Sequence, residues 1–537
     1  MKPTPIQALM QRAQDRPYDP VFIFHNVTWT YEMIASEVDR LARGMAAHGV
    51  KPGDRVALHM MNRPEYIVAY YACFRLGAIA APLRTAFTFA ELAPLLQRLT
   101  PALYIGDAAL YGNVAEISGS ILPLDRRFIV GEAGQCQNGA PWEELLGGAG
   151  NDDSLAPAAH EPAVLITTSG TTGVPKFVVH TASTLAETVE LVGRNLELSD
   201  DEIIPVPLAM AHMSGLLSFL CYVQLGIGFV LFESFDADAV LDAIERHGCT
   251  RYLGFPAQYA ALLECQQRKP RDLRSLRLCL TGGDACPIDL QQQVTSVFGA
   301  PLYNLWAATE AAGNLKFGLR PGPVVRIADG TKFRIVDDKG NDVADGETGE
   351  LLLRAGNIFD GYWNDPKATA ETLHGGWYHT GDLMRREQGD ELLFVARKKD
   401  IIIRGGTNIS PIEVEQAIVA SHIAVEEAAV VGMPDTVLGQ RILGFVRLAK
   451  GADEALIPQI RENLKTRLAA YKLPERLIVL DALPRNALSK IDRKALLAMA
   501  GDRPSPSAAI DRRAPVIVER ARARAMPDRV QALRAPR

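Results

Sequence analysis

Residues 165–180 read LITTSGTTGVPKFVVH, an apolar run that leads into an unbroken series of Thr, Ser and Gly residues and then Val-Pro-Lys. The apolar run predicts a buried strand. Hydroxyls and exposed backbone N–H groups can surround phosphate oxygens, and glycines allow the backbone to come close. The spacing from Gly170 to Gly173 to Lys176 is not that of a Walker A loop. These residues alone are therefore consistent with two interpretations, an ordinary loop and a phosphate-binding loop.

Segments around this loop alternate between helix and strand patterns. Apolar residues on one helical face predict a helix over 31–48, with Thr30 as its N-cap, and a strand follows over 55–60. The same reasoning predicts the following helices and strands: helices at 65–76 and 240–247, and strands at 79–83 and 250–255. Strands separated by helices indicate largely parallel sheets that are covered on both faces.

The pattern changes after about residue 325. Short strands at 332–336, 349–354 and 391–395, with Gly/Asp turns between them, predict a small β-rich subdomain. After Arg397 the chain reads as a separate α+β unit, with these expected elements: strands at 425–431, 443–448 and 476–480, and a helix at 455–469. We expect an α/β fold in which 1–398 form a large N-terminal domain and 399–500 a small C-terminal domain.

Composition limits the class of protein. The chain has 537 residues, 48% hydrophobic and 22% charged, with a formal net charge of −6, which is typical of a soluble globular protein of several domains and not of a dedicated nucleic-acid binder. Seven cysteines without a CxxC pair predict reduced, buried thiols.

The most apolar stretch, 216–232, is interrupted by Gln224, Gly226 and Gly228. It predicts a buried helix followed by a buried strand, without a transmembrane segment. Residues 501–537 carry nine Arg and five Pro, which predicts a solvated, disordered tail.

The Thr/Ser/Gly run resembles the phosphate loop of adenylate-forming (AMP-binding) enzymes: acyl-CoA synthetases, adenylation domains and luciferases. Further blocks that resemble this superfamily follow in the same order: Trp306-Ala-Ala-Thr-Glu310, Gly346-Glu-Thr-Gly-Glu-Leu351 with Gly361-Tyr-Trp363, Trp377-Tyr-His-Thr-Gly-Asp-Leu383, the long block 397–415, and Leu483-Pro-Arg-Asn-Ala-Leu-Ser-Lys490. The resemblance covers about residues 20–500. It implies an acyl-CoA synthetase of the AMP-forming, acid–thiol ligase type.

The resemblance implies a reaction in two halves. A carboxylate attacks the α-phosphorus of ATP, and a thiol then attacks the acyl-AMP that results. It implies the following nucleotide-binding residues: Thr168, Ser169, Gly170, Thr171, Thr172, Gly173, Lys176, Gly283, Asp284, Trp306, Ala307, Thr309, Asp382 and Arg397. Trp306 would stack on adenine, with a core aromatic as the alternative, and Asp382 would accept the ribose hydroxyls. Asp284 and Ala307 depart from the usual Ala and Gly. Glu310 would bind Mg²⁺.

The resemblance also implies a mobile C-terminal domain. Without the resemblance, Lys490 would be interpreted as a solvated lysine. The resemblance implies that it is a catalytic residue that bridges the carboxylate and the α-phosphate. Lys399 would be the hinge. After rotation, the Gly405 and Gly406 loop would replace Lys490 and line the tunnel for the pantetheine of CoA, with a simple turn as the rival interpretation.

The acyl pocket is the remaining part of the site. His212, in a block that resembles Pro-x-x-His, would orient the substrate as a second catalytic residue, although a satisfied core histidine is an equal alternative. Around it we expect apolar or small residues: Phe255, Pro256, Gln258, Leu305, Ala311, Ala312 and Gly313. They include no Asp placed to hold an ammonium group, so a fatty, alicyclic or aromatic acid fits better than an amino acid.

Two other functions stay open: a stand-alone adenylation enzyme that loads a carrier protein, and a non-catalytic protein that binds ATP or acyl-AMP. The expected substrates and cofactors are ATP, Mg²⁺, coenzyme A and a small carboxylic acid. We further expect fatty-acid metabolism, a cytoplasmic location and no nucleic-acid partner; a homodimer is left open.

Overall fold

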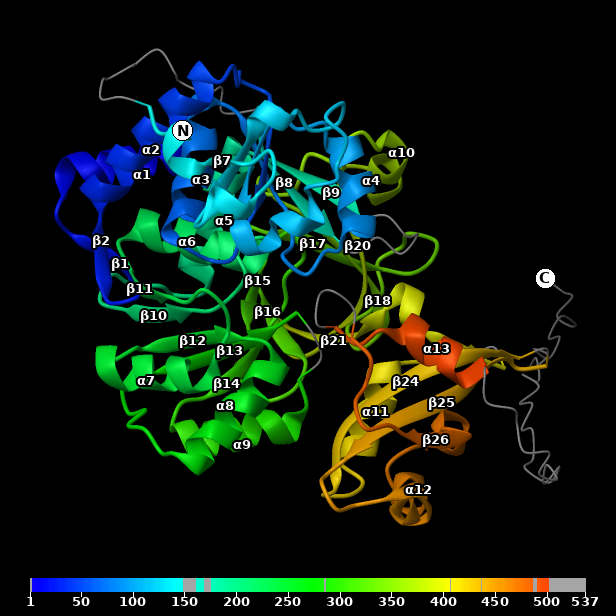
Figure 1. Ribbon diagram of the computed structural model, residues 1–537. Coiled ribbons are helices and arrows are strands. Elements are labelled where there is room, and N and C mark those ends of the chain that lie inside the picture. The colour runs from blue at the N-terminus through cyan, green and yellow to red at the C-terminus, as the bar shows by residue number, and fades with distance from the viewer. Residues whose placement is uncertain are drawn as a thin grey trace, which may run out of the picture.

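The computed structural model describes residues 2–147, 161–168, 175–283, 286–405, 407–435, 437–485 and 490–501, and within them the strands form five sheets (Figure 1). Three largely parallel or mixed sheets and one antiparallel sheet lie together, and the fifth sheet lies beside them with the last helices (Figure 1). The predicted α/β fold is confirmed. The domain boundary at 398 stays a prediction, and residues 502–537 of the expected tail lie outside the described residues.

The largest parallel array is a seven-stranded sheet. In order across the sheet its strands are β7 (Ala140–Pro141), β6 (Arg127–Val130), β5 (Leu103–Asp107), β3 (Arg55–His59), β4 (Ile79–Pro82), β8 (Pro162–Thr168) and β9 (Lys176–Thr181). All neighbours pair in parallel except β8 and β9, which are antiparallel, with Thr168 opposite Lys176. The Thr/Ser/Gly run therefore connects a hairpin.

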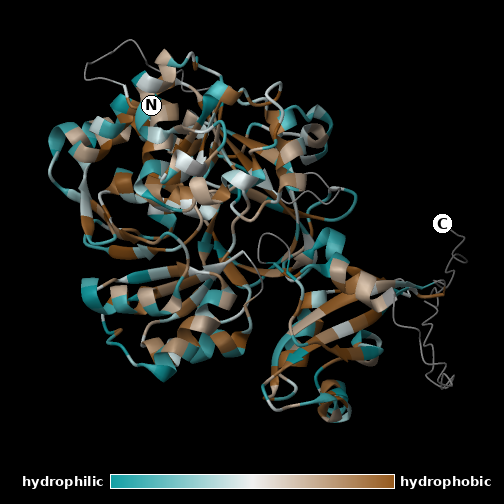
Figure 2. Cartoon of the chain, in the orientation of Figure 1, coloured by the Kyte–Doolittle hydropathy of each residue, from teal (hydrophilic) through white to brown (hydrophobic). Residues whose placement is uncertain are grey.

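Both faces of this sheet are buried. In β8, Val164 and Ile166 belong to one hydrophobic cluster, whereas Leu165 between them belongs to the cluster on the opposite face. This period-2 alternation between two cores is expected of parallel strands covered by helices on both sides. The strands are correspondingly brown in Figure 2, while exposed helical faces and loops carry teal.

Two smaller sheets complete the parallel part of the fold. One contains, in order, β10 (Ile203–Val206), β11 (Gly228–Leu231), β1 (Pro20–Phe24) and β2 (Val27–Thr30), and the other contains β12 (Arg251–Gly254), β13 (Leu278–Gly282) and β14 (Leu302–Leu305). All pairs except β1 with β2 are parallel.

The helices of this part cover the sheets. Their bounds are α1 (Pro5–Asp15), α2 (Tyr31–Ala47), α3 (Pro64–Leu76), α4 (Phe89–Leu99), α5 (Ala182–Asn195), α6 (Met213–Leu225), α7 (Ala237–His247), α8 (Pro256–Arg268) and α9 (Ile288–Phe298). Helix α10 (Pro366–Thr372) instead contacts the antiparallel sheet described below. The helices expected from periodicity are confirmed: Thr30 caps α2 by accepting from the Met33 N–H, and Gly77 ends α3 with a left-handed backbone. The apolar stretch from 216 is buried helix α6 followed by buried strand β11.

The predicted β-rich segment is an antiparallel sheet, and it begins at Leu315, earlier than the expected residue 325. It contains β15 (Leu315–Phe317), β16 (Val324–Ile327), β21 (Glu391–Arg397), β20 (Trp377–Arg386), β18 (Thr348–Arg354) and β17 (Lys332–Val336), with β19 (Leu373–His374) paired to β20.

The last sheet follows Arg397. It contains β23 (Thr407–Ile409), β22 (Ile402–Arg404), β25 (Gly439–Leu448), β24 (Val425–Asp435) and β26 (Arg476–Val479), and it packs with α11 (Pro411–Val419), α12 (Ile457–Lys465) and α13 (Arg493–Gly501). The helix expected over 455–469 is shorter. Pro458 lies in the first turn of α12, and the C-cap is Thr466. Among the described residues, no helix is long and apolar enough to cross a membrane.

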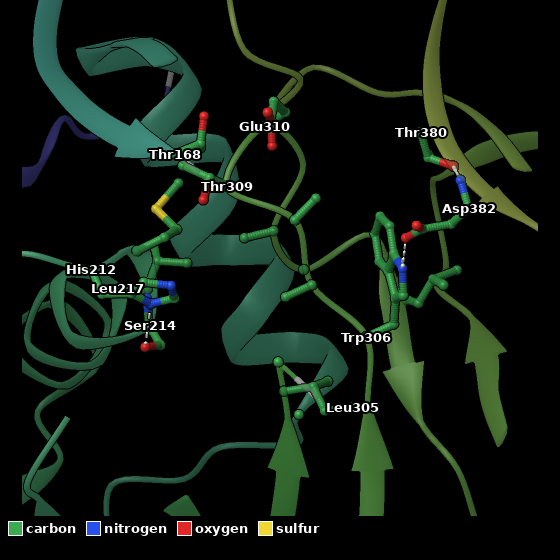
Figure 3. A pocket seen from close by; sticks show the side chains of 18 of the residues that line it. Thr168, His212, Ser214, Leu217, Leu305, Trp306, Thr309, Glu310, Thr380 and Asp382 are labelled. Carbon is green, nitrogen blue, oxygen red and sulfur yellow. Dashed lines mark hydrogen bonds between the residues drawn. The ribbon is translucent and has the colours of Figure 1, made fainter. Parts of the chain in front are cut away.

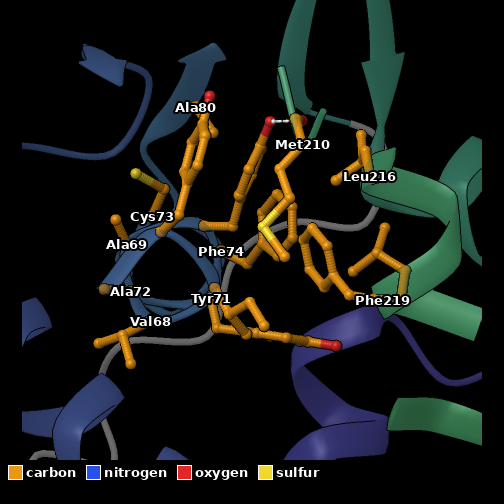
Figure 4. Packing of buried hydrophobic residues seen from close by; sticks show 14 of the residues in the cluster. Val68, Ala69, Tyr71, Ala72, Cys73, Phe74, Ala80, Met210, Leu216 and Phe219 are labelled. Carbon is orange, nitrogen blue, oxygen red and sulfur yellow. Dashed lines mark hydrogen bonds between the residues drawn. The ribbon is translucent and has the colours of Figure 1, made fainter. Parts of the chain in front are cut away.

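Helix α3 is buried nearly all round, and it supports the loop between β10 and α6. The Tyr70 and Tyr71 rings contact Phe219 of α6, and Phe74 packs against both tyrosines; Tyr71, Phe74 and Phe219 are seen in Figure 4. Asn62, just before α3, donates to the Leu208 and Phe232 carbonyls at 3.0 and 3.1 Å, and its Oδ1 accepts from the Met210 N–H at 2.8 Å. This one amide, 3% exposed, satisfies three backbone groups around the loop that leads to His212.

Replacing Asn62 by Ala should remove all three hydrogen bonds and leave buried backbone groups without partners. We expect the stability of this region to fall by roughly 2–4 kcal/mol. Urea denaturation measures the loss, and hydrogen exchange should show faster exchange in the peptide around Met210. As a control, Gln97→Ala on the exposed face of α4 should change stability by less than about 0.5 kcal/mol. An unchanged exchange rate at residues 207–212 would contradict the assignment.

Candidate active site

A cavity of about 840 Å³ opens where several parallel strands end. Its lining includes a residue at or just after the carboxyl end of each of six strands: Arg84, Thr168, Leu208, Gly254, Gly282 and Leu305. Ligand sites of open α/β sheets commonly occupy this edge. Figure 3 shows His212 and Ser214 on one side of the pocket and Trp306 and Asp382 on the other.

Asp382 is the most deeply enclosed acid of the cavity. It lies on β20 opposite Arg397 of β21, and the two side chains form an ion pair at 3.4 Å. The indole N–H of Trp306 donates to the other carboxylate oxygen at 2.7 Å. Burial raises the pKa of Asp382, while the Arg397 charge and the Trp306 hydrogen bond act in the opposite direction. A carboxylate has acceptor sites left for two hydroxyls after these contacts.

Trp306 is held on its edge by this hydrogen bond and is only 7% exposed. It belongs to the hydrophobic cluster of the antiparallel sheet and also lines the cavity. The two interpretations of this residue, core aromatic and adenine platform, are thus compatible with one position. Ala307, its neighbour, is exposed in the cavity lining.

Glu310 lies between the His212 side and the Trp306 side of the cavity (Figure 3), and Tyr362 connects it to Lys176. The Tyr362 hydroxyl donates to the Glu310 carboxylate at 2.9 Å, and Lys176 Nζ lies 4.7 Å from the centre of the Tyr362 ring. Burial raises the pKa of Glu310, and the Tyr362 hydrogen bond opposes this rise. Sequence reasoning assigned no role to Tyr362, although it quoted the Gly361-Tyr-Trp block that contains it.

Thr309 is positioned by a histidine that the motifs did not indicate. His180, at the end of β9, is fully buried, and its Nε2 lies 2.8 Å from the Thr309 carbonyl oxygen. Burial lowers the pKa of His180 to about 4, so the ring is neutral at pH 7 and Nε2–H is the donor. This contact joins the hairpin β8–β9 to the loop after β14.

His212 caps α6. The Ser214 N–H donates to Nδ1 at 3.2 Å, and the Ser214 hydroxyl lies 2.8 Å from the same atom. Because Nδ1 accepts, the neutral ring carries its proton on Nε2. Burial, followed by the positive charges of Arg84 and Lys490, lowers the pKa of His212 to about 3. At neutral pH this histidine is therefore an uncharged hydrogen-bond group.

Lys490 lines the first cavity and also a second one of about 980 Å³. The second cavity lies between the parallel sheets and the last sheet, since its lining includes Met60 and Phe235 as well as Ile412 of α11. Arg84, which no motif indicated, lines both cavities too. Lys490 therefore brings a positive charge from the last part of the chain to the first cavity, which also contains Asp382 and Glu310.

The far end of the first cavity is apolar. Phe255, Leu305, Ala312 and Gly313 line it as predicted, whereas Pro256 and Gln258 line the second cavity and Ala311 lines neither. Most of the apolar wall comes from α5, α6 and neighbouring segments that sequence reasoning missed: Val192, Leu196, Leu198, Met213, Leu217, Cys221, Tyr222, Leu253 and Leu315. The continuous hydrophobicity of α6 was the available signal.

Other predicted residues have different positions. Gly283 lines both cavities with φ +79°, and a Cβ there would come within 2.9 Å of the Phe255 ring. Lys399 lies in the short helical turn Lys398–Asp400 and lines the first cavity. Gly405 is in neither lining, and its N–H donates to the Leu438 carbonyl. The following predicted residues lie outside the described part of the chain: Ser169, Gly170, Thr171, Thr172, Gly173, Asp284 and Gly406.

Comparison with known proteins supports one family. The sequence pattern of AMP-binding enzymes matches residues 9–363, and that of the AMP-binding enzyme C-terminal domain matches residues 413–490. An indoleacetate–CoA ligase of Aromatoleum aromaticum is 34% identical over 86% of this chain and 91% of its own length. A medium-chain fatty-acid–CoA ligase of Escherichia coli is 30% identical over 87% of this chain and 85% of its own length.

Solved structures agree with this result. An anthranilate CoA ligase in complex with anthranoyl-AMP has a TM-score of 0.84 and 25% identity, covering 93% of this chain and 97% of its own. ATP-bound MatB from Rhodopseudomonas palustris also has a TM-score of 0.84 and 25% identity, covering 94% and 99%. The chain therefore belongs to the family of AMP-binding enzymes and is of the adenylate-forming, acyl-CoA synthetase type.

Proposed function

We propose that this acid–thiol ligase activates a hydrophobic carboxylic acid with ATP and transfers the acyl group from acyl-AMP to coenzyme A. One observation carries the proposal. A single cavity holds an enclosed carboxylate with its arginine, the Glu310 and Lys176 group, His212 and Lys490, and it continues into an apolar wall. These are the groups needed to bind a nucleotide and a carboxylate next to each other.

In the first half-reaction, a carboxylate oxygen attacks the α-phosphorus of ATP and pyrophosphate leaves. Asp382 accepts the ribose hydroxyls, and Arg397 donates to the same ribose. Thr309 contacts the α-phosphate from the loop that His180 holds. Lys490 lies between the reacting anions, where its charge offsets the negative charge that gathers in the transition state.

Magnesium would bind at Glu310. The described residues contain no group of three His, Cys, Asp or Glu side chains placed to hold a metal ion. A single partly buried carboxylate nevertheless suits Mg²⁺, which takes its other ligands from nucleotide phosphates and water. The bound ion would neutralise phosphate charge, and Tyr362 fixes the Glu310 carboxylate that would hold it.

The second half-reaction requires CoA to reach the acyl carbon. Lys490 lines the cavity in the present arrangement and Gly405 does not, as expected of the adenylation conformation. We propose that the part of the chain after Lys399 then turns. The Gly405 and Gly406 loop replaces Lys490, and AMP leaves after thiol attack.

The substrate is a hydrophobic acid. The wall from α5 and α6 offers no carboxylate to pair with an ammonium group, and an unpaired buried charge is costly. Related proteins are named as ligases of indoleacetate, medium-chain fatty acids and 2-succinylbenzoate, which supports an aryl or alkyl acid without selecting one. A role in fatty-acid metabolism, a carrier protein as alternative acceptor, a cytoplasmic location and a homodimer stay predictions.

A substrate panel tests the function directly. Octanoate, indole-3-acetate, benzoate and the common amino acids are each incubated with ATP, Mg²⁺ and CoA, and AMP and thioester are measured. We expect one or more hydrophobic acids to give AMP and thioester together, and free amino acids to give neither. AMP release without thioester would favour a carrier protein as acceptor. Turnover of amino acids alone would overturn the pocket assignment.

Asp382→Ala should weaken nucleotide binding and slow both half-reactions, because AMP stays bound in each. The loss of hydrogen bonds to a charged acceptor should cost roughly 3 kcal/mol, or about 100-fold in the Kd for ATP and AMP. Calorimetric titration measures both constants. The matched control is Asp342→Ala, whose carboxylate is exposed and pairs with Arg334, because neither residue lines the cavity; it should bind as the unmodified chain does. Unchanged AMP affinity in Asp382→Ala would remove this residue from the site.

Lys490→Ala should separate the two halves. Starting from ATP and acid, acyl-AMP formation should fall by about 100-fold or more, because the cation opposing the transition-state charge is lost. Starting from preformed acyl-AMP and CoA, single-turnover thioester formation should stay close to the original rate. Gly406→Leu should show the reverse pattern, and Lys465→Ala, an exposed lysine of α12, should change neither half. Equal loss in both halves for Lys490→Ala would refute the alternation of domains.

A further inference from the structure

The two cavities meet at a small polar junction. Both linings contain Arg84, His212, Ser214 and Lys490, together with the apolar Leu208 and Phe255. Among the described residues, no carboxylate belongs to this shared lining, whereas Glu310, Glu350 and Asp382 all lie in the part of the first cavity that the second does not share. The junction therefore has an excess of positive charge.

Arg84 stands two residues after β4 and is oriented by the neighbouring strand β8. Its Nη2 donates to the Thr167 carbonyl at 3.1 Å, and Nε lies 3.4 Å from the Thr167 hydroxyl. In the described ranges of the chain, Nη1 has no hydrogen-bond partner and the guanidinium has no ion pair. One edge of the guanidinium is thus held by Thr167, whereas Nη1 has no hydrogen-bond partner among the described residues.

Other enclosed arginines in the described part of this protein have more partners than Arg84 does. Arg127 donates to the carbonyls of Val114, Ala115, Ile117 and Leu122. Arg251 and Arg271 are also enclosed, and each pairs with a carboxylate, Glu202 and Asp242 respectively. Arg84 has fewer partners than these three, since it is half-buried and Thr167 is its only hydrogen-bond partner in the part of the chain that the structure describes.

The environment of Arg84 keeps its charge uncompensated. Burial lowers the pKa of Arg84 to about 10, and no neighbouring carboxylate contributes to the shift. The side chain is still a cation at neutral pH. His212 beside it remains neutral, so it adds no charge of either sign. A desolvated cation in a cleft gains most from an anion that enters the cleft.

We propose that Nη1 of Arg84 binds the carboxylate of the acid substrate at this junction, as a binding residue that acts before Lys490 does. The inference rests on the proposed function. The acid's apolar body would lie along the wall from α5 and α6, and its carboxylate would emerge beside His212. Lys176 lies instead over the Tyr362 ring, whose hydroxyl donates to Glu310, where the nucleotide phosphates are expected.

Arg84 and Lys490 differ in which part of the fold carries them. Arg84 follows β4 in the seven-stranded sheet that also contains Thr168, whereas Lys490 follows β26 of the last sheet. Arg84 thus stays in place when the last part of the chain turns. When acyl-AMP forms, the carboxylate loses its charge, and the attraction that Arg84 exerts on the free acid is lost with it.

The test uses the full-length chain with Arg84→Gln and Arg84→Lys, and with octanoate and indole-3-acetate as probes. Arg84→Gln should raise KM for the acid by about 10- to 100-fold, the range expected for one charge-assisted hydrogen bond, and should leave KM for ATP within about twofold. Arg84→Lys should be intermediate. Thioester formation from preformed acyl-AMP should stay within about threefold in both variants.

A second readout isolates the charge. Octanamide and indole-3-acetamide have the shape of the probes without their charge, so the preference for acid over amide, measured by inhibition, should shrink in Arg84→Gln. Arg98→Gln is the matched control, because Arg98 also donates to a backbone carbonyl, that of Pro175, and lies outside both cavities. Melting temperature and ATP affinity check that each variant is folded.

The outcomes separate the two proposals. If the unmodified chain makes no thioester from any acid of the panel, the proposed function fails. If it does, and Arg84→Gln raises KM for ATP as much as KM for the acid, the anion at Arg84 is a phosphate and the carboxylate assignment is wrong. A lower melting temperature with both KM values unchanged would show that Arg84 only fastens Thr167.

Discussion

Burial of both faces of the parallel sheets confines polar chemistry to the ends of the strands. Strands such as β8 alternate between two hydrophobic clusters and leave no face for a charged group. Thr168, Gly282 and Leu305 are the last residues of β8, β13 and β14, and all three line the same cavity. The site is therefore a consequence of the strand direction common to three sheets, because each strand delivers its carboxyl end to one place.

Charge is distributed unevenly along that cavity. Carboxylates gather near the antiparallel sheet, where Asp382 and Glu310 each have a donor that fixes them. Cations gather at the junction of the two cavities, where Arg84 and Lys490 stand beside a neutral His212. A molecule that carries hydroxyls at one end and an oxyanion at the other would complement this arrangement. An acid and a nucleotide that meet head to head have that pattern.

Sequence reasoning located the elements and the motif residues well, because both depend on short-range signals. Periodicity and capping place α2 and α3, and local blocks place Asp382 and Glu310. Arg84, His180 and Tyr362 were not found, since their roles arise from contacts between segments far apart in the chain, such as His180 with Thr309. The hairpin return of β9 was missed for the same reason, because strand pairing across a polar loop has no local signature.

The hydrogen bond between Trp306 and Asp382 also gives the protein a built-in optical probe. The chain has five tryptophans, and the fluorescence of an indole depends on the charge and solvent next to its N–H. Trp306 places that N–H 2.7 Å from the carboxylate on which the ribose would settle. A nucleotide that engages Asp382 changes the immediate surroundings of this fluorophore, so the emission spectrum reports occupancy of the site without an added label.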